Sequence, residues 1–171
     1  MTVDLYSLQR NPILILMANT YTQIHIHVVF AVKYRIALID PKWEGDLYRY
    51  ITGIIQSQGH KLLQINGMPD HIHILIGMRP NQSLSELIRT TKSRSTEWIN
   101  ANHKEVAHFL WQKGYGAFSL SREDIPRVAT YIQNQKKHHR ITSFDDEFTR
   151  ILDEYKVEFE ERYLLKSVLK S

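Results

Sequence analysis

Two histidines separated by one apolar residue are the part of the sequence best suited to chemistry. His71 and His73 lie in an alternating apolar segment with the period of two that is typical of a β-strand. Side chains alternate across a strand, so both imidazoles emerge on one face, roughly 7 Å apart along the backbone, while Ile72, Ile74 and Ile76 point toward the core. That spacing lets both rings reach one ion at about 2 Å per bond. We therefore predict a metal site at this pair.

His25 and His27 repeat the same spacing in an earlier strand-like segment. Either pair could instead be polar residues on a solvated or dimer-facing sheet surface. Asp70 precedes His71 at the mouth of a hairpin, where its carboxylate could orient the ring, as partners of metal-bound histidines do. His25 has no such neighbour. We therefore favour His71 and His73 as ligands, and a structural or dimer-packing role for the earlier pair.

Tyr131 stands out among the tyrosines because polar residues follow it on the same helix face. It lies in a segment whose periodicity predicts a helix over 124–139. At about 100° per residue, Tyr131, Gln135 and His138 share a polar face, and an apolar stripe beside it must pack on the domain. A phenol beside an amide oxygen and cations could address a phosphate. The alternative is a tyrosine used only for packing, and the polar residues on the following turns argue against it.

Basic residues recur near these positions and could line a groove for single-stranded DNA. The candidates are Lys33, Arg35, Arg89, Lys92, Arg94, Lys113, Lys136, Lys137 and His138. Tyr34, Trp111 and Tyr115 add rings on which bases could stack. Each is also compatible with an ordinary surface role, and the cations that end the tyrosine helix suit its dipole.

The periodicity predicts the elements that must position these residues. Strands are expected over 20–33, 60–66 and 71–78, with one or two more within 106–120, and helices over 40–59, 83–102, 124–139 and 144–155. Ser83 and Glu86 form a capping box at the second helix. This order predicts an α+β, ferredoxin-like fold of the kind seen in RNA-recognition domains, with a C-terminal tyrosine helix added. Helices should cover one face of its antiparallel sheet and leave the other for the site.

The composition suits one globular domain. The chain has 171 residues, 43% of them apolar, and no cysteine, so a metal must be held by histidine, carboxylate, amide or water. A net charge of +4 favours a nucleic-acid partner. No apolar run reaches the length of a membrane span, so we expect a soluble, cytoplasmic protein that acts at the nucleoid. Residues 1–16 are expected to be a disordered or non-native extension, 17–165 a single domain, and 166–171 a tail.

Four segments in this order resemble the single-tyrosine HUH transposases, the small insertion-sequence-two-hundred-like enzymes that move elements as single-stranded DNA. They are Tyr21–Arg35 ending in Lys-Tyr-Arg, Met68–Leu75 with its His-Ile-His, Trp111–Ser119, and Tyr131–His139. The likeness covers about residues 17–165. Several motifs in one order make it far more specific than the histidine pair, which the class shares with relaxases and rolling-circle replication initiators.

The resemblance implies that His71, His73 and Gln135 hold a divalent ion and that Tyr131 is the nucleophile. Members of the class are homodimers that use no nucleotide cofactor. They recognise imperfect hairpins at the element's ends, cut one strand through a 5′-phosphotyrosine link and rejoin strands. In many, the tyrosine helix reaches into the partner subunit's site, which leaves assembly in cis or in trans open here. Mg²⁺ is expected, with Mn²⁺ as a substitute, because imidazole favours softer ions.

Other functions share parts of this pattern. A domesticated relative would use the same residues to process repeated chromosomal palindromes. A non-catalytic module that binds single-stranded nucleic acid could share the sheet, but it would need neither Tyr131 nor Gln135. A metal-dependent hydrolase that uses water as the nucleophile would stay active in a Tyr131→Phe variant.

Overall fold

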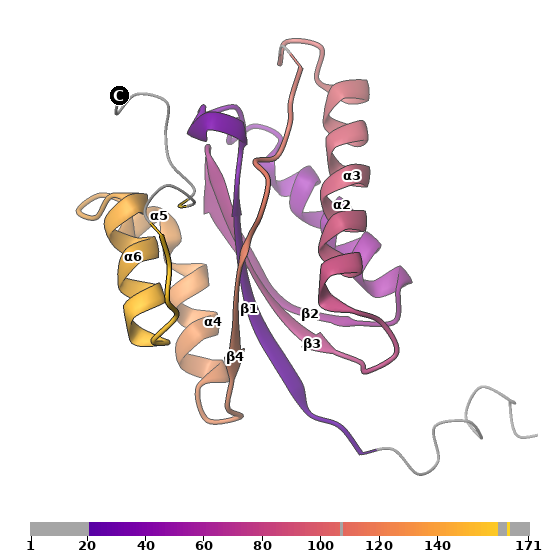
Figure 1. Ribbon diagram of the computed structural model, residues 1–171. Helices are drawn as coiled ribbons and strands as arrows, with labels where there is room; N and C mark the ends of the chain where they lie inside the picture. The colour runs from indigo at the N-terminus through magenta and orange to yellow at the C-terminus, as the bar shows by residue number, and fades with distance from the viewer. Residues whose placement is uncertain (1–20, 107, 161–163, 165–171) are drawn as a thin grey trace, which may run out of the picture.

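The fold is built on a four-stranded antiparallel sheet in the order β2-β3-β1-β4 (Figure 1). The structure is a computed structural model, and it describes residues 21–106, 108–160 and 164. Its strands are β1 (Ile24–Ala31), β2 (Lys61–Met68), β3 (His71–Met78) and β4 (Gly116–Leu120). The element order and the antiparallel pairing confirm the predicted ferredoxin-like α+β class.

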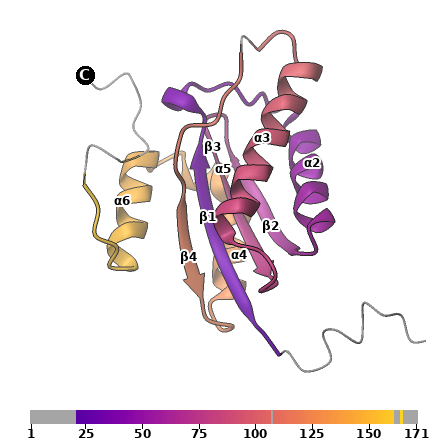
Figure 2. The same ribbon diagram turned by 45° about the vertical axis from the view of Figure 1, so that its right-hand side comes forward.

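Two long helices, α2 (Glu44–Ser57) and α3 (Leu84–Asn102), cover one face of the sheet (Figures 1 and 2). The side chain of Ser83 accepts a hydrogen bond from the backbone N–H of Glu86, which is half of the expected capping box. The isoleucines of β3 lie in the same buried cluster as apolar residues of both helices, as the strand alternation predicted.

One short strand, β4, forms in the segment over 106–120, where one or two strands were predicted. After α3 the chain returns toward the sheet with one isolated bridge between Val32 and Trp111, and β4 begins only at Gly116. A short 3-10 turn, η1 (Lys33–Arg35), follows β1 and carries the Lys-Tyr-Arg motif. Tyr34 and Arg35 have positive φ values of 60° and 57°, so this turn changes the chain direction sharply at the end of β1.

The second face of the sheet is also covered, which differs from the prediction of an uncovered face. The covering helices are α4 (Ile125–Gln133), α5 (Gln135–His138) and α6 (Phe144–Glu154) (Figure 2). Val128 and Ile132 of α4 bury their side chains with Leu75 of β3. The apolar side of α6 packs on Val29 and Ala31 of β1. Apolar residues lie beside the histidines on this face, and the C-terminal helices shield these apolar residues from water.

The predicted tyrosine helix is two helices. The chain leaves α4 at Asn134, whose φ of −93° and ψ of 13° are not helical, and restarts as α5 at Gln135. Pro126 lies in the first turn of α4, as expected for a residue without an N–H. The break turns Gln135 into the protein, where its side chain is buried.

The predicted extension over 1–16 and the predicted tail over 166–171 lie outside the described residues. Residues 157–160, which follow α6, have no regular secondary structure. Across the described part of the chain, no helix combines the length and the apolar character needed to cross a membrane.

Candidate active site

Strand β3 places His71 and His73 side by side beneath the C-terminal helices. Their side chains are 1% and 0% exposed, and the ring centroids lie 5.2 Å apart. Burial lowers the pKa of His71 to about 4, an effect that the neighbouring Asp70 opposes. At neutral pH this imidazole is therefore uncharged, which is the form that binds metal ions.

Asp70 orients His71. Nδ1 of His71 donates a hydrogen bond of 2.7 Å to Oδ1 of Asp70, so its Nε2 is left to face the site. Arg35 donates to Oδ2 of Asp70 through Nε at 2.8 Å, and its guanidinium lies 4.0 Å above the Phe144 ring. Burial acts to raise the pKa of Asp70, but His71 and Arg35 outweigh it and hold the value at about 2. The carboxylate therefore stays ionised as an acceptor.

His27 orients His73. The pairing of β1 with β3 brings Nε2 of His27 within 3.0 Å of Nδ1 of His73, and the two rings stack. Burial, followed by the nearby His73, lowers the pKa of His27 to about 3, so its ring is neutral. With Nδ1 of His73 as the donor, Nε2 of His73 carries a free lone pair. That atom is buried and has no hydrogen-bond partner among the residues that the structure describes. His27 therefore lies at the site without facing it as a ligand.

Gln135 reaches the same point from α5. Its Nε2 donates a hydrogen bond of 2.9 Å to Oε1 of Glu147, while its own Oε1 is buried without a partner. A buried polar atom without a partner is costly, so it indicates a partner of another kind. Oε1 of Gln135, together with Nε2 of His71 and of His73, makes a donor set that suits a divalent cation. The residues present therefore fit the metal that the sequence predicts.

Glu147 and His139 complete this cluster, and the sequence analysis missed both as site residues. Ligand atoms of His71, His73, His139 and Glu147 all lie within 4.8 Å of one another and could hold a metal ion. Glu147 is fully buried in α6. A signal was present, because Glu147 falls on the apolar face formed by Phe144, Phe148 and Ile151. A lone carboxylate among core positions is a candidate for a site.

Tyr131 lies next to the histidines of its own chain. Its ring centroid is 5.9 Å from that of His73 and 6.2 Å from that of His27, and its hydroxyl donates a hydrogen bond to Oε1 of Glu147. Burial, and then the charge of Glu147, raises the pKa of Tyr131 above its usual range. Four residues that were predicted from separate motifs thus meet in one place: His71, His73, Tyr131 and Gln135.

A cavity of about 330 Å³ opens beside Tyr131 between α4 and α6. Arg127 and Arg150 line it together with His27. Both arginines are exposed, and NH2 of Arg150 lies 3.3 Å from Nε2 of His138. Arg127 is paired with Asp124 and with Glu154, and Glu154 also lines the cavity. The cavity therefore holds two arginines and a carboxylate beside the phenol.

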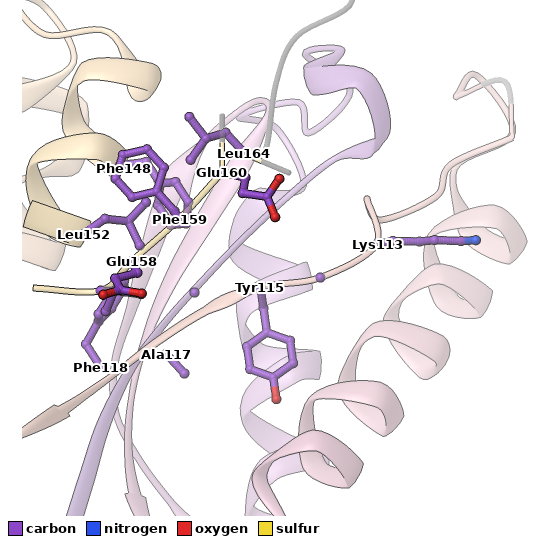
Figure 3. A pocket seen from close by; sticks show the side chains of 13 residues that line it. Lys113, Tyr115, Ala117, Phe118, Phe148, Leu152, Glu158, Phe159, Glu160 and Leu164 are labelled. Atoms are coloured by element: carbon purple, nitrogen blue, oxygen red, sulfur yellow. The ribbon is translucent and has the colours of Figure 1, made fainter. Parts of the chain in front are cut away.

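A larger cavity, of about 880 Å³, lies away from the histidines, between β4, α6 and the segment that follows it. Figure 3 shows Phe148 and Leu152 from α6 beside Phe159, with Lys113 set apart from them. None of the clustered histidines lines this cavity. Volume alone therefore does not locate the chemistry in this molecule.

Three of the predicted DNA-binding cations are engaged within the protein. Arg35 forms ion pairs with Asp70 and Asp145. The ammonium of Lys92 donates to the backbone oxygens of Gln112 and Gly114, and burial lowers the pKa of Lys92 to about 8. Lys136 pairs with Glu44 of α2. These contacts give the three side chains positioning roles that a count of charges could not predict.

The remaining candidates lie on several different elements. Arg89 and Arg94 are exposed on α3, which covers the sheet face opposite the histidines, and Lys113 is exposed before β4. Lys33 lies 4.9 Å from the ring of Tyr34. Lys137 is exposed on α5, and the ring of its neighbour His138 lies 5.5 Å from that of Tyr131. Of these candidates, His138 has its ring beside that of Tyr131.

The expectation that Trp111 stacks on bases is wrong. Its side chain is 8% exposed, packs edge-on against Phe30 and Phe109, and donates a hydrogen bond from Nε1 to Ser95. Trp111, which forms the isolated bridge with Val32, is therefore part of the hydrophobic core. Tyr34, at 51% exposure, keeps an accessible ring.

Known proteins resemble this chain in sequence and in fold. The family model of the IS200-like transposases matches residues 20–135. The ISDra2 transposase TnpA of Deinococcus radiodurans is 22% identical over 118 residues, which cover 66% of this chain and 84% of that protein.

Two solved structures share the fold. A crystal structure of a Deinococcus radiodurans protein assigned as a transposase has a TM-score of 0.55 and 22% identity, and the match covers 68% of this chain and 94% of that one. A REP-associated tyrosine transposase bound to a REP hairpin also has a TM-score of 0.55, with 14% identity, over 71% and 72% of the two chains.

The family match takes in more than half of the chain and includes the histidine pair, Tyr131 and Gln135. It confirms the resemblance on which the sequence analysis relied. The chain belongs to the family of IS200-like transposases, enzymes that bind DNA and transfer its strands in transposition.

Proposed function

We propose that this protein cuts and rejoins single-stranded DNA at the ends of an insertion sequence, with Tyr131 as the nucleophile. One observation carries the proposal. Two buried atoms without hydrogen-bond partners, Nε2 of His73 and Oε1 of Gln135, belong to the side-chain network that also holds the Tyr131 hydroxyl. Buried donor atoms of this kind beside a phenol are what a metal-dependent tyrosine nucleophile requires.

His71, His73 and Gln135 would hold the ion. A divalent cation bound there neutralises charge on the scissile phosphate and polarises it toward attack. We expect Mg²⁺ to serve and Mn²⁺ to substitute, because the donor set combines an oxygen with two imidazoles. No nucleotide cofactor is needed, because a phosphotyrosine link conserves the energy of the phosphodiester bond.

The residues of the chain account for the transfer. The phenol oxygen of Tyr131 bonds to phosphorus, the bond from phosphorus to the 3′ oxygen breaks, and the 5′ phosphate remains on the tyrosine. Since the pKa of Tyr131 is raised, its proton must leave as the new bond forms, and the hydroxyl already points at Oε1 of Glu147. The released 3′-hydroxyl is then available for the reverse attack that rejoins strands.

The substrate we propose is single-stranded DNA with hairpin ends, handled by a homodimer. The REP-associated tyrosine transposase that shares the fold is bound to a hairpin. In this chain, Arg150 at the cavity beside Tyr131 could contact a phosphate of the strand. A module that only binds nucleic acid would have no use for a buried cation site beside a phenol.

The test is a search for the covalent intermediate. The protein is incubated with end-labelled single-stranded DNA that carries the hairpin flanking its gene, with Mg²⁺ or Mn²⁺, and a denaturing gel is read for a protein–DNA adduct. Tyr131→Phe should abolish the adduct, and Tyr50→Phe, the same change at an exposed position on α2, should leave it intact. His71→Ala and His73→Ala should each prevent cutting. An adduct in Tyr131→Phe, or cutting that persists there through water, would contradict the proposal.

A further inference from the structure

We infer that Glu147 is a further ligand of the ion, and that its carboxylate links the metal centre to the nucleophile. The inference rests on the proposed function, since it adds to the ion held by His71, His73 and Gln135. It assigns a catalytic role to α6, an element beyond the residues 20–135 that the family model matches.

The two oxygens of Glu147 face two different groups of residues. Oε1 accepts hydrogen bonds from the hydroxyl of Tyr131 and from Nε2 of Gln135. Oε2 lies 2.8 Å from Nε2 of His139, 3.5 Å from Nε2 of His73 and 3.7 Å from Nε2 of His71. One carboxylate thus lies between the nucleophile on one side and the imidazoles on the other.

The separation of Glu147 from His73 fits two ligands around a shared ion, and the separation from His71 is slightly longer. Nitrogen-to-oxygen hydrogen bonds are about 2.7–3.2 Å long, so 3.5 Å and 3.7 Å exceed that range. Ligands bound at about 2.1 Å to one ion lie about 3–3.5 Å apart in octahedral or tetrahedral arrangements. Because Nε2 of His73 has no other partner, an ion between it and Oε2 of Glu147 gives both atoms a binding role.

Because Glu147 is buried, its negative charge also needs a positive partner. Its side chain is fully buried, and its oxygens accept hydrogen bonds from Tyr131, Gln135 and His139. A buried carboxylate is stable only when paired or coordinated, and among the described residues the ion-pair partners of Glu147 are imidazoles. A divalent cation supplies the missing countercharge.

His139 acts here as a positioning residue. Its Nε2 donates to Oε2 of Glu147 at 2.8 Å and lies 3.1 Å from Nε2 of His71. It therefore sets the rotation of the carboxylate, which keeps Oε1 on Tyr131 while Oε2 faces the imidazoles. Binding of the ion and the position of the phenol are thereby coupled through one side chain.

The test measures metal affinity, not activity. The full chain is titrated with Mn²⁺ by calorimetry, and free Mn²⁺ is followed by electron paramagnetic resonance. In Glu147→Gln the amide oxygen can still accept from Tyr131 and Gln135, but the amide nitrogen that replaces Oε2 cannot bind a cation. We expect its Kd for Mn²⁺ to rise by about tenfold or more. Asp153→Asn makes the same change at an exposed carboxylate of α6 and should stay within about twofold of the wild type.

The outcomes separate the two proposals. If Glu147→Gln binds Mn²⁺ as the wild type does while His73→Ala loses binding, Glu147 is no ligand and the proposed function stands. If His71→Ala and His73→Ala also bind unchanged, the metal centre itself is overturned. Circular dichroism checks folding. Should Glu147→Gln not fold, Glu147→Asp replaces it: a shorter carboxylate should weaken Mn²⁺ binding several-fold, and an unchanged Kd would overturn the inference.

Discussion

In each predicted metal ligand, the polar atom that does not face the ion site forms a hydrogen bond with another side chain. Asp70 holds Nδ1 of His71, His27 holds Nδ1 of His73, and Glu147 holds Nε2 of Gln135. Such contacts choose the tautomer of a ring, or the orientation of an amide, before any ion binds. The predicted metal ligands are therefore held in place by hydrogen bonds from the side chains that surround them.

His27 gives a test at this scale. His27→Phe keeps a ring but removes the acceptor for Nδ1 of His73, so we expect the Kd for Mn²⁺ to rise by about 10–100-fold. His27→Gln, whose amide oxygen can reach the same nitrogen, should restore most of the affinity. His25→Phe, two residues earlier in β1, is the matched control and should have little effect. Equal losses in the two phenylalanine variants would refute a specific role for His27.

Among the elements, the β2–β3 hairpin controls where the histidines begin. Gly67 pairs with Ile72, and a Cβ built on Gly67 would lie 2.2 Å from the backbone oxygen of His71 and 2.8 Å from Cα of Ile72. Only glycine permits this approach, because backbone atoms cannot move aside as a side chain can. The hairpin thereby sets the position of His71 relative to Asp70.

Gly67→Ala should therefore disturb both the fold and the site. We expect a loss of about 2–3 kcal/mol in the free energy of unfolding, measured with urea, and weaker Mn²⁺ binding. Gly53→Ala is the control, since a Cβ there meets no atom within 4 Å on α2 and alanine favours the helix. It should raise stability by about 0.5–1 kcal/mol. If Gly67→Ala is as stable as the wild type, glycine is not required at this position of the hairpin.

At the scale of the whole molecule, the C-terminal helices close over the sheet of their own chain. The apolar side of α4 packs on Leu75, and α6 packs on Val29 and Ala31, so both are fixed by burial rather than by hydrogen bonds alone. This packing brings Tyr131 to the histidines within one polypeptide. From this packing we predict assembly in cis.

Mixing inactive chains tests this arrangement. When Tyr131→Phe and His71→Ala proteins are combined, assembly in cis leaves every site without either a nucleophile or a ligand. The mixture should then form no more adduct with hairpin DNA than the two variants do separately. Adduct recovered in the mixture would show that the tyrosine helix exchanges between subunits, and the packing of α4 on Leu75 would have to break in the active dimer.

Local patterns were sufficient for most of the elements and for two halves of the site. Alternation in β3 predicted its residues and put both histidines on one face, and helical spacing put Gln135 one turn after Tyr131. The break at Asn134 was not predictable, because it depends on burying Gln135 against the sheet. The roles of Lys92 and Arg35 were equally hidden, since charge on its own does not show whether a carbonyl or a carboxylate lies nearby.

By itself, the sequence determined the face on which each candidate residue lies, since that depends on backbone geometry over a few residues. The tertiary structure alone decided which faces meet. His27 and His73 are 46 residues apart, and Gln135 and Glu147 belong to different helices, so their contacts depend on how strands pair and helices pack. Glu147 shows the difference most clearly. Its place on an apolar helix face is written in the sequence, but its position between Tyr131 and the histidines exists only once α6 covers the sheet.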